Sequence, residues 1–169
     1  MLHFETALGT CGLTWSDAGV TGVLLPGMRG LGRQAAREAE AVPESARDAA
    51  AAIVALMDGE RTDLRWVVLD ETGIEPFRRS VYAASRGIPA GATASYGDIA
   101  RAIGKPDAPR AVGHALGENP FPIVVPCHRV LSSTGALHGF SAPGGIITKR
   151  RLLEIERAPG FTQLSLMQA

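Results

Sequence analysis

SYGDIARAIGKPDAPRAVGHALGEN, residues 95–119, contains two short helix patterns separated by a tight turn. Ser95 with Asp98 three residues later is a capping-box pattern, which marks the start of a helix, and Gly104 marks its end. Pro109 is well tolerated in the first turn of the second helix. Two short helices about a tight turn are typical of a helix-turn-helix motif. Most such pairs are plain packing units, so both interpretations stay open at this point.

The second of these helices carries unusually small residues. Ala111 and Ala115 lie one turn apart, and so do Gly113 and Gly117. Glycine inside a helix costs about 1 kcal/mol, so two glycines need a reason. Close packing against another helix is one explanation. The other is close approach to a sugar–phosphate backbone, with Arg110 projecting from the first turn.

Charge is divided unevenly along the chain. Residues 1–75 hold 12 acidic and 6 basic residues, a net charge of −6, whereas residues 76–169 hold 5 acidic and 11 basic residues, a net charge of +6. We expect an N-terminal lobe over 1–75 and a C-terminal lobe over 76–169. A basic lobe favours an anionic partner such as nucleic acid, although chance segregation of charge would give the same pattern.

The first lobe is predicted to be α/β. LHFETAL, GLTWSD and VTGVLLP are strand patterns punctuated by glycines, and GMRGLGRQ is a loop pattern. A helix is predicted from Ser45 to about Asp58, and DLRWVVLDETG is predicted as a further strand and turn. The second lobe is mostly helical, because PFRRSVYAASRGI and TKRRLLEIERAPG add helices on either side of residues 95–119.

The composition excludes several classes of protein. No run of about 18 apolar residues exists, so we expect no transmembrane helix and no membrane partner. The N-terminus MLHFETALGT lacks the pattern of a secretory signal. Cys11 and Cys127 are the only cysteines, which excludes a disulfide framework or a four-cysteine zinc site and favours the reducing cytosol.

Cys127 stands between Pro126 and His128, directly after the apolar segment PFPIVV. A cysteine in such a segment is more often a small buried hydrophobe than a nucleophile. If the backbone is extended, neighbouring side chains point apart, and a water molecule would have to connect Cys127 with His128. Both interpretations of the cysteine remain open from the residues alone.

The predicted C-terminal helix carries an acidic residue on its apolar face. At about 100° per residue, Glu156 falls inside the arc formed by Leu152, Leu153 and Ile155, whereas Glu154 points outward. A carboxylate on a buried face needs a partner. An arginine such as Arg129 is one candidate partner, and a histidine held in one tautomer is the other.

PCHRV at 126–130, with IPAGATASYGDIA and RAVGHALGENPFPIVV before it, resembles the O6-alkylguanine-DNA alkyltransferases. The match is close over 77–156 and loose in the first lobe. It implies a ribonuclease-H-like α/β N-terminal lobe and a mostly α C-terminal lobe with a helix-turn-helix. It also implies repair of double-stranded DNA containing O6-alkylguanine, by flipping the nucleotide and moving the alkyl group once to a cysteine, with no cofactor. O4-alkylthymine is a further possible substrate, and a non-catalytic sensor of alkylated DNA is the alternative.

The resemblance assigns roles to five residues around the reaction. Cys127 is the alkyl acceptor, and His128 is the base that activates it through water. Glu156 orients the histidine. Asn119 is the hinge before the active-site segment. Tyr96 reaches guanine N3 and the DNA backbone. We expect a cytoplasmic monomer with no obligate protein partner.

The resemblance also assigns substrate and DNA contacts. Arg110 enters the base stack where the target nucleotide left, and the carbonyl of Val130 accepts from the guanine amino group. Ser141 and Phe140 belong to the loop GFSAPGG that closes over O6; many relatives have tyrosine at the position of Phe140, which leaves the range of alkyl sizes open. The DNA-binding residues are Arg110, Ala111, Gly113, Ala115, Tyr96 and Ser95.

Some members of the family bind zinc in the first lobe through cysteine and histidine. The first lobe of this chain offers only Cys11 and His3 for such a site. A structural zinc site normally has four ligands. We therefore predict no metal.

Overall fold

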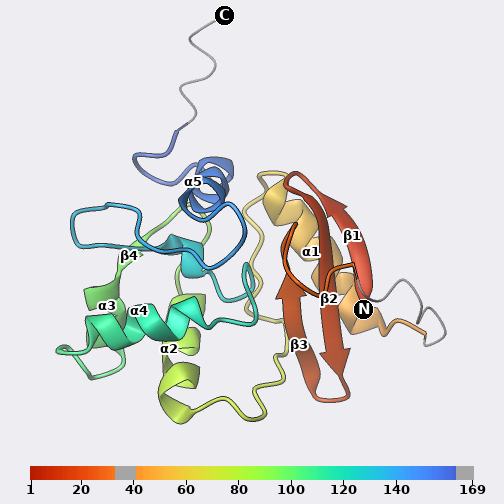
Figure 1. The fold of residues 1–169 in the computed structure, drawn as a ribbon, viewed down its shortest axis with the longest axis horizontal. Coiled ribbons are helices and arrows are strands. Elements are labelled where there is room, and N and C mark those ends of the chain that lie inside the picture. Colours follow the sequence, from red (N-terminus) through yellow and green to blue (C-terminus); the bar gives the residue numbers. More distant parts are fainter. Residues whose placement is uncertain (33–40, 163–169) are drawn as a thin grey trace, which may run out of the picture.

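The computed structural model of the protein describes residues 1–32 and 41–162. The first lobe contains a three-stranded antiparallel sheet in the order β1-β2-β3, with α1 packed against it (Figure 1). Cys11 and Leu13 of the sheet and Ile53 of the helix are fully buried. The three predicted strands and the predicted helix are confirmed, with bounds β1 Leu2–Thr6, β2 Gly9–Ser16, β3 Gly19–Leu24 and α1 Glu44–Met57. The last residues of the predicted loop GMRGLGRQ lie outside the described residues.

The second lobe is mostly helical and lies beside the sheet (Figure 1). A short parallel pair of strands, β4 and β5, joins the segment before α3 to the segment after the cysteine. The mostly α second lobe predicted from the sequence is confirmed, so the molecule is a two-lobe α/β protein. Its elements are α2 Pro76–Arg86, β4 Ala94–Ser95, α3 Tyr96–Ala102, α4 Pro109–Gly117, a 3₁₀ turn at Cys127–Arg129, β5 Val130–Leu131 and α5 Ile146–Ile155.

The helix pair α3–α4 forms as the capping pattern predicts. The Oγ atom of Ser95 accepts a hydrogen bond from the Asp98 backbone N–H at 2.9 Å, and Asp98 Oδ2 accepts one from the Ser95 N–H at 2.8 Å. Ile99 of α3 and Val112 and Leu116 of α4 are buried in the common core. The two helices therefore pack as one unit about the turn at 104–108.

Two expectations about backbone conformation were wrong. DLRWVVLDETG is not a strand, since its only ladder contact is a single bridge between Leu69 and Val20. Its buried residues, Leu64 and Val67, are three apart, whereas the side chains on one face of a strand are two apart, and Trp66 and Val68 are 51% and 67% exposed. Cys127 and His128 are not on extended backbone either, because they lie in the 3₁₀ turn.

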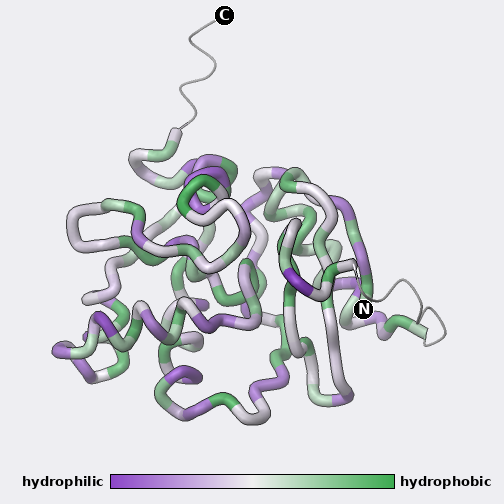
Figure 2. The backbone as a smooth tube through the Cα atoms, in the orientation of Figure 1, coloured by the Kyte–Doolittle hydropathy of each residue, from purple (hydrophilic) through white to green (hydrophobic). Residues whose placement is uncertain are grey.

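The two lobes share one continuous hydrophobic core. Hydrophobic and hydrophilic residues alternate along the strands and helices, as expected for elements with one buried side (Figure 2). One backbone hydrogen bond crosses from the sheet to the segment before the cysteine, from Val23 N to Pro120 O at 3.0 Å. No helix in the described part of the chain is long and apolar enough to span a bilayer.

Candidate active site

The segment before Cys127 is tied down by one side chain. The amide of Asn119 donates from Nδ2 to Val125 O at 3.0 Å and accepts at Oδ1 from the Phe121 N–H at 2.9 Å. Asn119 therefore fixes both ends of a short loop. Inside this loop Ile123 has φ 75°, and a β-branched residue in this region of the φ/ψ map stores about 1–3 kcal/mol of strain. The loop holds this conformation because its neighbours determine it, and it delivers Cys127 to the surface of the core.

Glu156 has both of the partners that the sequence left open. Its Oε1 atom lies 2.8 Å from His128 Nε2, and the Arg129 guanidinium donates to both carboxylate oxygens, at 2.9 and 2.7 Å. All three side chains are buried. The helical wheel therefore placed the carboxylate on the correct face, although α5 ends at Ile155 and Glu156 is its C-cap. Glu154 is partly exposed.

In this buried cluster, desolvation stabilises the neutral forms of the Cys127 thiol and the His128 imidazole. Burial raises the pKa of the Cys127 thiol, and Asn119 and Lys149 oppose this only in part. Burial also lowers the pKa of His128, although Glu156 opposes that shift. A resting thiolate–imidazolium pair is therefore disfavoured by desolvation.

His128 nevertheless has the form of a general base. Its Nε2 atom is bound to the carboxylate of Glu156, whereas its Nδ1 atom is buried with no hydrogen-bond partner among the described residues. Burial alone would raise the pKa of the Glu156 carboxyl, but His128 and Arg129 outweigh burial and hold this pKa well below its usual range. The carboxylate therefore fixes the Nε2–H tautomer and leaves Nδ1 free to accept a proton.

Lys149 is a buried residue of the site that sequence reasoning missed. Its side chain is 1% exposed, and Nζ donates to Val130 O at 2.7 Å and to His138 O at 3.2 Å. Nζ also lies 3.5 Å from the hydroxyl of Tyr96. The wheel that identified Glu156 could have found it, since Lys149 falls at about 60° on the same apolar arc.

Tyr96, the first residue of α3, is held with its hydroxyl protonated. Burial raises the pKa of this hydroxyl, and the nearby Cys127 adds to the effect. The ring is partly buried against the core, and the Lys149 ammonium lies 5.8 Å from the ring centroid. Tyr96 is thus a hydrogen-bond donor at neutral pH that stands in the same cluster as the thiol.

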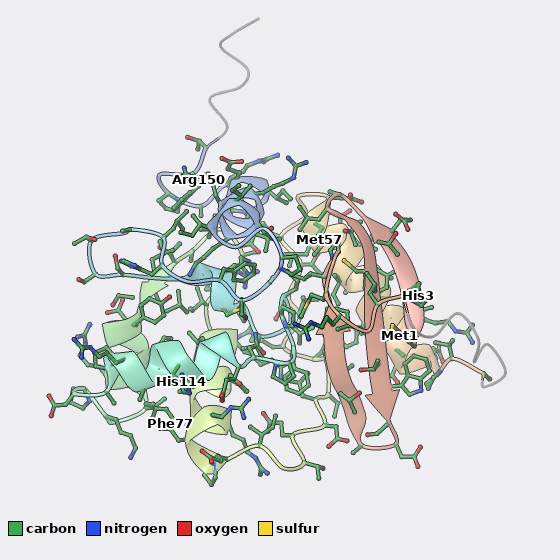
Figure 3. The ribbon with its side chains drawn as sticks, in the orientation of Figure 1. Met1, His3, Met57, Phe77, His114 and Arg150 are labelled. Atoms are coloured by element: carbon green, nitrogen blue, oxygen red, sulfur yellow. The ribbon has the colours of Figure 1, made fainter. Side chains whose placement is uncertain are left out.

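The outward face of α4 is largely exposed, and its one ion pair within the described residues joins His114 to Glu118 at the end of the same helix, at 3.6 Å. Arg110 and Ala111 are exposed, and His114 projects from the same helix (Figure 3) with its side chain 81% exposed. A methyl group added at Gly117 would meet nothing within 4 Å, and one at Gly113 would meet only Tyr96, at 3.6 Å. Packing within the molecule therefore does not require glycine at either position.

Two of the residues predicted to contact DNA make contacts within the protein instead. Ala115 is 2% exposed and its carbonyl accepts from the Tyr82 hydroxyl at 2.9 Å, so it lies on the inner side of α4. Ser95 uses its Oγ atom as the N-cap of α3. The free face of α4 is therefore narrower than the sequence pattern predicts.

The loop at 139–145 adjoins the cluster formed by Tyr96, Lys149 and Val130. Phe140 is partly buried against the core, whereas Ser141 is exposed. The adjacent carbonyl of His138 is held by Lys149. Lys149 therefore connects this loop to Val130, the residue predicted to accept from a bound guanine.

The first-lobe residues considered for zinc have other partners. His3 lies on β1 (Figure 3), and its Nε2 atom is 2.7 Å from Leu31 O. Cys11 on β2 is fully buried, with its sulfur 3.6 Å from Thr6 Oγ1. Within residues 1–32 and 41–162, no group of three or more His, Cys, Asp or Glu side chains is placed to hold a metal.

The chain is similar to known proteins. A family model described as 6-O-methylguanine DNA methyltransferase, DNA binding domain, matches residues 76–158. A methylated-DNA–protein-cysteine methyltransferase of Methanothermobacter thermautotrophicus is 35% identical over 145 residues, which cover 86% of this chain and 78% of that relative. The chain belongs to the methylated-DNA–protein-cysteine methyltransferase family. The resemblance inferred from PCHRV and its flanking motifs is confirmed.

Members of the methylated-DNA–protein-cysteine methyltransferase family from mycobacteria are more similar over a shorter region. The protein of that name from Mycobacterium tuberculosis is 48% identical over 108 residues, and the match spans 63% of its length. The solved structure of Mycobacterium tuberculosis OGT in complex with DNA aligns with a TM-score of 0.72 at 37% identity and covers 94% of both chains. The two-lobe arrangement is thus common to this chain and that structure.

Proposed function

We propose that the protein repairs DNA by direct reversal, moving a methyl or other alkyl group from O6 of guanine to Cys127. One observation carries the proposal. Cys127 adjoins a buried histidine that a carboxylate holds through Nε2 at 2.8 Å and whose Nδ1 is free. This arrangement activates a cysteine nucleophile, and it occurs in a member of a family named for alkyl transfer to cysteine.

The proposed reaction is a displacement at a saturated carbon. The sulfur of Cys127 attacks the alkyl carbon, a C–S bond forms, and the bond from that carbon to O6 breaks. The thiol proton passes through a water molecule to Nδ1 of His128, and Glu156 stabilises the imidazolium. The departing guanine carries the electron pair, and the Tyr96 hydroxyl offsets its charge by donating a hydrogen bond at N3.

The product limits each molecule to one reaction. The C–S bond of a thioether is not cleaved by thiol reductants, and the other cysteine, Cys11, lies on β2 of the first lobe. We therefore expect a stoichiometric protein with no cofactor. O4-alkylthymine presents a similar alkoxy carbon and is included as a possible second substrate.

We propose double-stranded DNA as the partner and the free face of α4 as its docking surface. O6 of a stacked guanine cannot reach a buried sulfur, so the nucleotide must leave the helix at a cost of a few kcal/mol. Arg110 makes no hydrogen bond or ion pair within the described residues, so its side chain is available to fill the gap. Gly113 and Gly117, which internal packing does not require, allow close approach of a sugar–phosphate wall.

We infer three further points about the whole molecule. The three-stranded antiparallel sheet covered by α1 supports assignment of the first lobe to the ribonuclease-H-like class. We place the boundary between the lobes at 75/76, directly before α2. The two unpaired cysteines, both buried, support a reducing compartment such as the cytoplasm.

Intact mass spectrometry tests the proposed function. The protein is incubated with a duplex oligonucleotide that contains a single O6-methylguanine, and peptide mapping then locates any added methyl group. We expect one methyl group on Cys127, none on Cys11, and no further gain with excess DNA. Binding to the duplex without any gain of mass would identify a sensor of alkylated DNA and reject the transferase.

A further inference from the structure

A cavity lies behind the active-site turn, between the two lobes. Its volume is about 540 Å³, and it is lined by residues 61–65 of the first lobe and by residues 86–92 and parts of 123–129 of the second. No residue of α3 or α4, both described in full, contributes to its walls. The cavity is therefore separate from the surface proposed to bind DNA, and its volume is typical of small-molecule sites.

The lining of this cavity is rich in arginine. Four arginines line it together with a single carboxylate residue, Asp63. Asp63 is already bound by Arg65, at 3.0 and 2.9 Å, and Arg129 is bound by Glu156. The remaining two arginines, Arg61 and Arg86, form no ion pair with a carboxylate among the described residues.

Arg86 is fixed in the wall but incompletely satisfied. Its Nη2 atom donates to the carbonyls of Leu64, Arg65 and Val67 at 2.7–3.2 Å, which joins α2 to the first lobe. Its Nε atom is buried and has no hydrogen-bond partner among the described residues. Burial also lowers the pKa of this guanidinium, and Glu71 and Asp63 oppose the shift only in part. Because Nε has no accessible surface, a ligand cannot reach it; Nη1, which makes no hydrogen bond within the described residues and is not buried, is the donor left for one.

Gly91 leaves room for the side chain of Arg61 at the same cavity. A methyl group on Gly91 would lie 3.3 Å from Arg61 Nη2 and 3.2 Å from the carbonyl oxygen of Glu156. The absence of a side chain at Gly91 thus allows the guanidinium to lie against the backbone beside Glu156. Arg61 makes no ion pair within the described residues, so its outward donors are available.

We propose that this cavity binds a small phosphorylated molecule, with Arg61 and Arg86 as the residues that hold the phosphoryl groups. A guanidinium binds phosphate oxygens through two parallel N–H donors, which is stronger and more specific than a single contact. Arg61 has its donors free for this geometry and Arg86 adds Nη1, so the two positive charges together match a ligand that carries at least two negative charges. The inference does not depend on the proposed alkyl transfer.

A ligand here would be in contact with the active-site turn. Pro126 and Arg129 line the cavity, and Arg129 also donates to Ile88 O at 2.7 Å in the same wall. A bound phosphate would therefore stabilise the junction of both lobes beside the turn. We expect this stabilisation to appear as a higher melting temperature, because a ligand that binds only the folded state shifts unfolding by mass action.

Inorganic pyrophosphate is the probe, and the full-length protein is titrated by calorimetry with the ionic strength held constant by sodium chloride. We expect one saturable site and a higher melting temperature. Arg61→Ala should weaken binding at least tenfold, and Arg61→Gln should do the same while keeping the length of the side chain. Arg150→Ala is the matched control, because Arg150 is exposed on α5 (Figure 3) and does not line the cavity.

Three results would overturn the proposal. The first is a titration that does not saturate, or a melting temperature that sodium chloride raises equally. The second is equal weakening by Arg61→Ala and Arg150→Ala, which would show diffuse attraction between charges. The third is displacement of pyrophosphate by unmodified duplex DNA from wild-type protein but not from Arg110→Ala, which would assign the phosphate contacts to DNA binding. Circular dichroism of each variant establishes that it is folded.

Discussion

Replacing Lys149 with methionine removes a buried ammonium group from the centre of the site. Burial lowers the pKa of Lys149 from 10.5 to about 8, and one pKa unit corresponds to about 1.4 kcal/mol. The charged form therefore costs the folded state about 3 kcal/mol. Below pH 8 the group is charged in both states and the full cost is present. Between pH 8 and 10.5 the unfolded chain binds more protons, so the stability of the wild-type protein should rise with pH relative to the variant.

Urea unfolding of both proteins from pH 7 to pH 10.5 measures this effect. The free energy of unfolding of the wild type minus that of Lys149→Met should increase by about 3 kcal/mol across the range. Cys127 and Tyr96 titrate in both proteins, so most of their contribution cancels in the difference. Lys105→Met, which changes the other lysine of the chain, an exposed one, should leave the difference flat. A flat difference for Lys149→Met would show that the ammonium is solvated and would refute the reasoning.

The remaining predictions concern the reaction itself. Cys127→Ser should abolish alkyl transfer and change affinity for alkylated duplex less than tenfold, as measured by mass spectrometry and fluorescence anisotropy. Arg110→Ala should slow transfer from duplex DNA far more than from free O6-benzylguanine, and equal slowing would indicate a structural role. Glu156→Gln should destabilise the fold by about 3–5 kcal/mol, because Arg129 loses a buried carboxylate, and should raise the pKa of Cys127 by weakening the hold on His128. Glu154→Gln should do neither. An unshifted thiol pKa in folded Glu156→Gln would refute the proposed transfer of the Cys127 proton to a histidine held by Glu156.

Local patterns predicted the helical part of the molecule well. The Ser95–Asp98 capping box and the glycines that end helices act over a few residues, so the sequence contains all of the information that they need. The orientation of Glu156 also followed from helical periodicity alone. Periodicity did not show that Glu156 binds both of its candidate partners at once. His128 and Arg129 are adjacent in sequence, and only the 3₁₀ turn brings both side chains to the same carboxylate.

Features that depend on contacts distant in sequence could not be predicted. The segment DLRWVVLDETG has the composition of a strand, but only Val20 is available to pair with it. Ala115 shares a helical face with Ala111, yet the Tyr82 hydroxyl and the core cover it. The positive φ of Ile123 contradicts the preference of its own residue type, and contacts made by Asn119 and Pro120 hold it in place.

The hydrogen bond from Val23 N to Pro120 O provides a remote reporter on the reacting sulfur. The amide proton of Val23 belongs to the sheet, yet its acceptor lies at the start of the loop that carries Cys127. Its exchange with solvent deuterium therefore measures how often that loop separates from the sheet. A change in this one exchange rate after treatment with alkylated DNA would register an event in the second lobe from a probe in the first. Neighbouring amides paired only between β1 and β2 would serve as the internal standard.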